Sequence, residues 1–284
     1  MTASTRTLSF VAMKGGVCKS TNAANIGAEL ARMGQMVLLV DLDPGAGLTQ
    51  FVGADQEGIP EPDAWLGDLL VAGAYGQAER AMVLSPQPGC AERLWIMPSQ
   101  GSALGAAEKL LSGANDGAFR LSKMLNQLHA NWDWIIVDTP PNLETFSFCS
   151  MVAATDVFIC CTPEAATYTK APEVPEQFEV AVQISRAIGN QREPKLRGVI
   201  RSKGEGRKAI ANRISLQWLE DEGLTVCPII PTKHAFIGNT AANGVPAVLA
   251  FPDSDTAEDY RRLIRWIVDL QDDDAAAAAE RIAA

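Results

Sequence analysis

The sequence predicts an α/β fold with a doubly wound, mostly parallel sheet, and three observations support this prediction. Short apolar runs recur along the chain, and stretches with helical periodicity separate them. In several runs the apolar residues are consecutive rather than alternating, as in strands that are buried on both faces. Three of the runs end in glycine-rich or aspartate-containing motifs, which places polar groups at strand ends.

Seven runs have the composition of strands. In chain order they cover 7–13, 36–41, 94–98, 134–138, 156–162, 196–200 and 225–231. Apolar residues spaced three and four apart predict helices over 23–33, 119–129, 209–220 and around 260–270. Residues 53–92 show weak periodicity and predict no element. We expect a single domain over 1–270 and an acidic, alanine-rich tail over 271–284 that is a fraying helix or disordered.

The composition is that of an ordinary globular protein. The chain has 284 residues, of which 47% are hydrophobic and 20% charged, enough for one large core. Residues 1–10 lack the apolar stretch of a signal peptide, and no run has the roughly 18 apolar residues of a membrane span. The six cysteines show no C-x-x-C spacing, so we expect reduced thiols and a cytoplasmic protein.

The charge is unevenly distributed. The formal net charge is −10, but the segment 186–213 holds nine basic residues against Glu193 and Glu205, a local charge of +7. Such asymmetry predicts an anion-binding surface. The nine basic residues are Arg186, Arg192, Lys195, Arg197, Arg201, Lys203, Arg207, Lys208 and Arg213.

The stretch M-K-G-G-V-C-K-S-T over 13–21 departs from the phosphate-loop pattern G-x-x-x-x-G-K-[ST]. Met13 and Cys18 occupy the two fixed glycine positions. The context still favours a phosphate site, because a strand runs into the loop and a helix follows at once. That order gathers backbone N–H groups and a helix N-terminus around one point. The candidate nucleotide-binding residues are Gly15, Gly16, Val17, Cys18, Lys19, Ser20 and Thr21.

Two further strands end in aspartates. V-L-L-V-D-L-D-P ends in Asp41 and Asp43, and W-I-I-V-D-T-P-P contains Asp138. In open α/β sheets ligands lie beyond the carboxyl ends of the strands, so these motifs and the glycine-rich loop project to one edge. Either aspartate motif alone could be a solvated strand end. The convergence of all three motifs favours a nucleotide site.

These motifs resemble those of ParA/MinD-type ATPases, the P-loop proteins with a deviant Walker A box, K-G-G-x-G-K-[ST]. The resemblance is carried by K-G-G-V-C-K-S-T, V-L-L-V-D-L-D-P, I-I-V-D-T-P-P and a later segment over 229–248, and it is greatest to ParA partition proteins. It implies a P-loop NTPase-like fold that uses ATP or ADP with Mg²⁺. It also implies a homodimer with two ATP molecules sandwiched at the interface, and slow hydrolysis stimulated by DNA and a partner.

The resemblance assigns roles to individual residues. Lys14 is the signature lysine that reaches the partner's phosphates, Lys19 is the conventional phosphate-loop lysine, and Asp43 positions the attacking water. In the same family pattern Ser20 ligates Mg²⁺, and Asp41 and Asp138 support the ion through water. Adenine contacts are expected from the 229–235 segment, with Pro231 as the candidate, and from the end of the 196–200 strand.

Cys18 departs from the family pattern, which has glycine there. Glycine permits either a positive φ or a close approach of backbone to phosphate. A side chain in the left-handed conformation costs about 1–2 kcal/mol. We expect a tolerated substitution, since the amide that binds phosphate remains; the alternative is a redox-sensitive thiol whose pKa is lowered by the helix N-terminus.

Members of this family differ in what the ATP-bound dimer contacts. ParA-like proteins bind DNA without sequence preference and act with a ParB-like or cargo-adaptor protein. The basic segment favours this nucleoid-associated function, and the predicted DNA contacts are Arg201, Lys203, Arg207 and Lys208, at the surface between a strand and a helix.

Two alternatives remain. A MinD-like protein would sit on membrane through a C-terminal amphipathic helix rich in lysine, whereas Asp272–Asp274 would be repelled by anionic lipid, so we expect no membrane partner. In the other alternative Cys18 spoils the loop, and the chain is a nucleotide-binding scaffold with negligible turnover.

Overall fold

The computed structural model describes residues 5–190, 192–203, 209–231, 240 and 243–283. Over these residues it contains a seven-stranded sheet in the order β3-β4-β2-β5-β1-β6-β7. Every neighbouring pair is parallel except β3 and β4. The predicted fold class is therefore confirmed. The strands are β1 Arg6–Val11, β2 Val37–Asp41, β3 Val83–Leu84, β4 Leu94–Met97, β5 Trp134–Asp138, β6 Asp156–Cys161 and β7 Lys195–Arg201.

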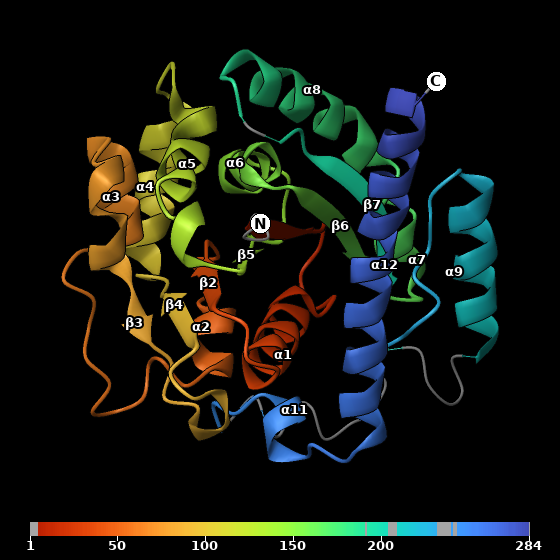
Figure 1. Ribbon diagram of the computed structural model, residues 1–284, viewed down its shortest axis with the longest axis horizontal. Helices are drawn as coiled ribbons and strands as arrows, with labels where there is room; N and C mark the ends of the chain where they lie inside the picture. The colour runs from red at the N-terminus through yellow and green to blue at the C-terminus, as the bar shows by residue number, and fades with distance from the viewer. Residues whose placement is uncertain (1–4, 191, 204–208, 232–239, 241–242, 284) are drawn as a thin grey trace.

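Helices cover both faces of the sheet (Figure 1). Helices α1, α11 and α12 pack on one face, and α3 to α6 with α8 pack on the other. Over the described residues, no helix combines the length and the apolar content needed to span a bilayer. The α-helices are α1 Lys19–Arg32, α2 Gly47–Phe51, α3 Leu66–Ala72, α4 Ser102–Ser112, α5 Gly117–Asn126, α6 Thr145–Ala153, α7 Ala165–Tyr168, α8 Glu173–Ala187, α9 Ala209–Asp221, α11 Ala247–Ala250 and α12 Asp255–Ala283.

Alternation along each central strand explains the two layers. In β1, Leu8 and Phe10 belong to the cluster that contains residues of α1 and α12, whereas Val11 belongs to the cluster formed with α6 and α8. Strand side chains point alternately to the two faces, and both faces are covered by helices. The runs of consecutive apolar residues therefore correspond to fully buried strands, as predicted.

One predicted strand is wrong. The segment 225–231 makes only an isolated parallel bridge, between Val226 and Val199. Pro228 and Pro231 lack the N–H group that a ladder needs, so the pairing does not extend. The region 53–92, for which no element was predicted, contains α3 and the two-residue antiparallel strand β3. At the other end of the chain, the helical backbone of α12 continues to Ala283.

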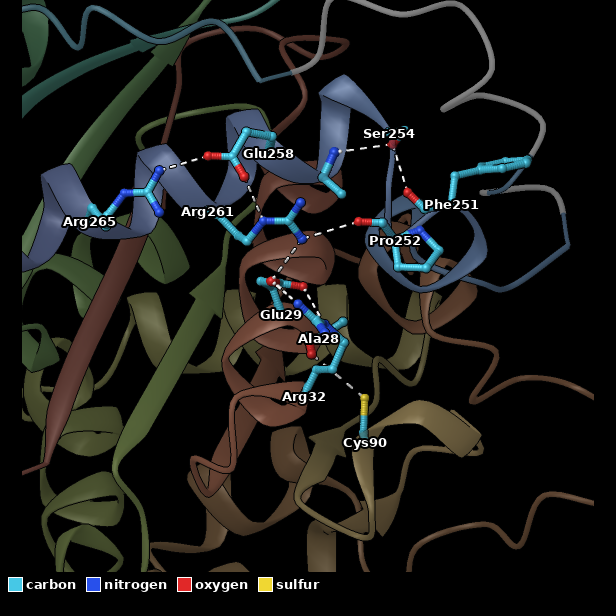
Figure 2. Close-up of polar contacts among 11 residues, drawn as sticks. Ala28, Glu29, Arg32, Cys90, Phe251, Pro252, Ser254, Glu258, Arg261 and Arg265 are labelled. Carbon is cyan, nitrogen blue, oxygen red and sulfur yellow. Dashed lines mark hydrogen bonds and ion pairs between the residues drawn. The ribbon is translucent and has the colours of Figure 1, made fainter.

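Helix α1 packs closely against strand β2 and is paired by charge to helix α12. A Cβ atom added to Gly27 would lie 2.7 Å from Leu39 Cδ2, so the helix approaches β2 through its glycine. Glu29, which is fully buried, accepts hydrogen bonds from Arg32 Nε at 2.9 Å and Arg32 Nη2 at 2.6 Å. Its Oε1 also accepts from Arg261 Nη1 of α12 at 3.5 Å, and Figure 2 shows this arrangement. The helix that follows the glycine-rich loop is thus fastened to both the sheet and the C-terminal helix.

Candidate nucleotide-binding site

The glycine-rich loop joins β1, which ends at Val11, to α1, which begins at Lys19. Two of its residues have left-handed backbone conformations: Gly16 with φ +76° and Cys18 with φ +69°. The positive φ that glycine would normally provide at position 18 is therefore present with a side chain attached. The backbone of Cys18 still opens the helix, because its carbonyl accepts from Asn22 N at 2.9 Å. The loop is intact, at the expense of local strain.

The two lysines of the loop have different surroundings. Lys19 is buried, with 6% of its surface exposed, whereas Lys14 is exposed. Lys19 therefore faces groups within this chain, and its charge lowers the pKa of Asp138. The Lys14 side chain is exposed to solvent, where a second protein molecule could contact it.

The three sequence motifs lie together at the carboxyl edge of the sheet. Thr139 Oγ1 donates to Phe10 O at 2.7 Å, which fastens the D-T-P-P loop to β1. A Cβ atom on Gly15 would lie 3.7 Å from Pro141 Cβ, and one on Gly47 would lie 3.0 Å from Ser20 Oγ. Each loop thus contacts the glycine-rich loop or its helix. The contact at Gly47 is tighter than a side chain normally makes, whereas the distance at Gly15 is an ordinary van der Waals contact.

Asp41 and Asp138 are direct neighbours on β2 and β5, and both are fully buried. Burial raises the pKa of Asp41, and the negative charge of Asp138 raises it further. The Asp41 carboxylate is engaged within its own loop. Its Oδ2 accepts from Thr49 N at 2.9 Å and Thr49 Oγ1 at 2.7 Å, and its Oδ1 accepts from Asp43 N at 3.1 Å. Asp41 therefore shapes the loop that carries Asp43.

Asp138 has no such internal partner. Neither carboxylate oxygen accepts a hydrogen bond from any residue that the structure describes. Burial raises the pKa of Asp138, while the Lys19 charge and the nearby Ser20 hydroxyl act in the opposite direction. Lys19 and Ser20 thus compensate the charge of Asp138 in part, while its oxygens accept no hydrogen bond and can take a further ligand.

The Ser20 hydroxyl and the Asp138 carboxylate are oxygen donors of the kind that hydrated Mg²⁺ takes. Over the described residues there is no group of three or more His, Cys, Asp or Glu residues that could hold a metal. Mg²⁺ usually keeps several waters and takes only one or two protein ligands together with substrate phosphates. Ser20 and Asp138 would hold the hydrated ion, which would supply charge neutralisation at the phosphates. Asp41 is engaged by Thr49, and its support of Mg²⁺ through water stays a prediction.

Asp43 is half-buried at the tip of this loop. Its Oδ1 accepts from Gly45 N at 2.8 Å, and its main-chain carbonyl accepts from Ser99 Oγ at 2.8 Å. The sequence did not point to Thr49 or Ser99, although they position the two aspartates. Thr49 lies eight residues beyond Asp41, and Ser99 follows a different strand, so no local pattern could have identified them.

Pro231, the adenine candidate, is buried. The rest of the predicted adenine segment, 232–235, lies outside the described residues, so the adenine contacts stay a prediction. All six cysteines lie within the described residues and are free. Cys18 is half-buried, and the other five are buried.

The basic segment does not form one surface. Arg201 is only 4% exposed and donates from Nη1 to Asn212 O at 2.9 Å, so its predicted place on the surface is wrong. Strand β7 is seven residues long, about 20 Å. It therefore separates Arg192 and Lys195 at one edge of the sheet from Lys203 at the other. Arg207 and Lys208 lie outside the described residues.

Lys203 contacts the glycine-rich loop. It is exposed, has φ +61°, and donates from Nζ to Gly16 O at 2.7 Å. The sequence predicted only a DNA contact for this residue. Its contact with a residue 187 positions away follows from the strand order, which no local pattern reveals.

A parallel sheet with a glycine-rich loop at the start of α1, and with two buried aspartates at the same edge, defines a P-loop nucleotide-binding protein. The family model AAA_31, described as an AAA domain, matches residues 5–179. The chain therefore belongs to this family, and it is a member of the ParA/MinD-type group that its motifs predicted.

Individual relatives agree with this assignment. The chain is 27% identical over 266 residues to the chromosome-partitioning ATPase Soj of Treponema pallidum, covering 93% of this chain and 97% of the relative. Cobyrinic acid a,c-diamide synthase of Mycobacterium smegmatis, solved with an ATP analog and magnesium, is 26% identical. It covers 88% of this chain and 93% of its own, with a TM-score of 0.69.

The septum site-determining protein MinD of Pyrococcus horikoshii, solved with Mg-ADP, shares the fold. Its TM-score is 0.67 at 22% identity, with 90% of this chain and 93% of the MinD chain covered.

Proposed function

We propose that this chain is an ATP-dependent, dimerising ATPase that binds ATP or ADP with Mg²⁺. The observation that carries the proposal is the buried, unpartnered Asp138 beside Ser20 and Lys19, at the edge where three motifs converge. Such a carboxylate is stable only with a compensating ligand. The relatives solved with an ATP analog and magnesium, or with Mg-ADP, support the choice of ligand.

The proposed reaction depends on charge and position rather than on covalent catalysis. Phosphoryl transfer to water needs neutralised phosphate charge and an oriented nucleophile. Lys19 would neutralise the phosphates from within the chain, and the exposed Lys14 would do so for a second protomer. Asp43, held by Gly45 N at the loop tip, would orient the water. ATP would thus join two protomers, and hydrolysis would separate them.

We further propose that the dimer binds DNA without sequence preference and partitions cargo with a ParB-like or adaptor protein. Similarity to a chromosome-partitioning ATPase supports this function. Because Arg201 is buried and Lys203 contacts the glycine-rich loop, the proposed DNA contacts are now Arg207 and Lys208. Each would be present twice in a dimer, which makes one multivalent site from two weak ones.

Fluorescence anisotropy with a random-sequence duplex, ATP and Mg²⁺ tests this proposal. The double variant R207E/K208E should lose DNA binding and retain the ATP-dependent dimer. Its matched control is R192E/K195E, which makes the same change of charge at the amino-terminal end of β7 and should bind as the parent does. If the four charges of the dimer neutralise four phosphates, parent affinity should fall by about a hundredfold between 50 and 200 mM salt.

Other results would contradict parts of the proposal. Equal DNA binding by R207E/K208E and the parent would remove the DNA contacts, and binding to anionic liposomes instead of DNA would favour a MinD-like function. A Lys14→Ala variant that still dimerises with a nonhydrolysable ATP analogue would remove the trans-acting lysine. Unchanged phosphate release in Asp43→Ala would contradict the water-orienting role of Asp43. Absence of phosphate release in the parent would contradict the ATPase activity itself.

A further inference from the structure

Lys203 joins the end of β7 to the phosphate loop. It lies two residues beyond the last residue of the strand, Arg201. Strand β6 stands between β7 and β1, so the lysine reaches across a strand end to bind the Gly16 carbonyl. The distance of 2.7 Å from Nζ to Gly16 O is typical of a charge-assisted hydrogen bond. This contact fixes one peptide group of the loop from outside.

The peptide geometry explains why this contact concerns phosphate. The bond between Gly16 and Val17 is a trans peptide, in which the C=O and N–H groups point in opposite directions. An ammonium that holds the Gly16 oxygen therefore directs the Val17 N–H away from Lys203. In a phosphate loop the backbone N–H groups cradle the α- and β-phosphates, so the carbonyls must turn outward.

The backbone at Gly16 makes an external anchor useful. Its φ of +76° and the φ of +69° at Cys18 are both left-handed. Glycine can leave such a conformation at no steric cost, and for Cys18 leaving it is favourable by about 1–2 kcal/mol of conformational free energy. A cation on the Gly16 carbonyl opposes that rearrangement. The protein thus has a means to keep the loop open for phosphate although glycine is missing at position 18.

We propose that Lys203 is a positioning residue of the phosphate loop: it holds the Gly16 carbonyl outward so that the Val17 N–H is presented to the nucleotide diphosphate. This inference rests on the nucleotide binding proposed above. It moves Lys203 out of the DNA surface and into the nucleotide site.

The test compares nucleotide affinities of the parent, K203M, K203R and K195M by isothermal titration calorimetry. Methionine keeps most of the side-chain length without the charge, arginine keeps the charge, and Lys195 is an exposed lysine at the other end of β7. K203M should bind ADP and a nonhydrolysable ATP analogue about tenfold more weakly, in equal measure. K203R should recover most of this loss, and K195M should match the parent.

Two controls separate positioning from other roles. The melting temperature of nucleotide-free K203M should equal that of the parent, because the side chain is exposed. At saturating nucleotide, K203M should bind a random-sequence duplex as the parent does. A purely structural residue would change the first measurement, and a DNA contact would change the second; either change overturns the inference.

The remaining outcomes are also decisive. Unchanged nucleotide affinity in K203M overturns the positioning role while leaving the nucleotide site in place. Weaker binding of the ATP analogue with unchanged binding of ADP would mean that Lys203 contacts the terminal phosphate directly, and would overturn it as well. If the parent itself binds neither nucleotide, the proposed function fails and this inference fails with it.

Discussion

Two fully buried carboxylates, Glu29 and Asp138, have opposite surroundings. Glu29 is held by Arg32 of its own helix and by Arg261 of α12, so its charge is compensated within the chain. Asp138 lies beside a second buried carboxylate, Asp41, and accepts no hydrogen bond from the residues that the structure describes. Burying an unpaired charge costs several kcal/mol. Glu29, paired with two arginines, therefore stabilises the fold, while Asp138, which has the Lys19 charge nearby but accepts no hydrogen bond, identifies where a ligand binds.

The largest effect is expected from Glu29→Gln. A neutral amide cannot compensate the two arginines, so the free energy of unfolding should fall by about 3 kcal/mol. Urea unfolding of the nucleotide-free protein measures this loss. Glu258, an exposed carboxylate that pairs with Arg261 and Arg265, gives the control, and Glu258→Gln should cost less than Glu29→Gln because water replaces its partners. Equal losses would show that burial of Glu29 is energetically unimportant.

Asp138→Asn should have a smaller effect on the empty protein. The substitution relieves the repulsion between Asp138 and Asp41 but removes the attraction between Asp138 and Lys19, so the free energy of unfolding should change by less than about 1 kcal/mol. The stabilisation that Mg-ADP gives to the parent should disappear. Urea unfolding with and without Mg-ADP tests both statements together.

Asp41→Asn is the control for this variant. Asp41 accepts two hydrogen bonds from Thr49, so its replacement should destabilise the empty protein. If Asp138→Asn were as destabilising as Asp41→Asn, Asp138 would have a structural role like that of Glu29, and the contrast between the two carboxylates would be lost.

The smallest effect is expected from Cys18→Gly. Glycine relieves the left-handed strain at φ +69° but gains entropy in the unfolded chain, so the net gain in stability should be about 0.5 kcal/mol. Cys18→Ala keeps the strain and should show no such gain. Thermal unfolding of the two variants measures the difference. An equal gain in stability in both variants would mean that loss of the thiol, and not relief of backbone strain, causes the effect.

Much of the fold could be predicted because its signals are local. Consecutive apolar residues identified β1, β2 and β4 to β7, since a strand buried on both faces needs no polar positions. The rule that motifs at strand ends share the carboxyl edge then brought the three loops together before any contact was known. The segment 225–231 shows the limit of this reasoning. It has a strand's composition, yet its prolines leave it with one bridge.

The amino-acid sequence by itself determined the buried parallel sheet, the edge that carries the site, and the loop with a cysteine in place of glycine. Only the tertiary structure decided how the charged groups are used. It buries Arg201 and divides the basic segment between two edges of the sheet. Thr49 donates hydrogen bonds to Asp41, whereas the Asp138 oxygens accept none from the described residues. The physical reason is distance along the chain. Periodicity records which face a residue turns inward, but the partner of a charge depends on strand order and helix packing, which bring Lys203 to Gly16 and Arg261 to Glu29.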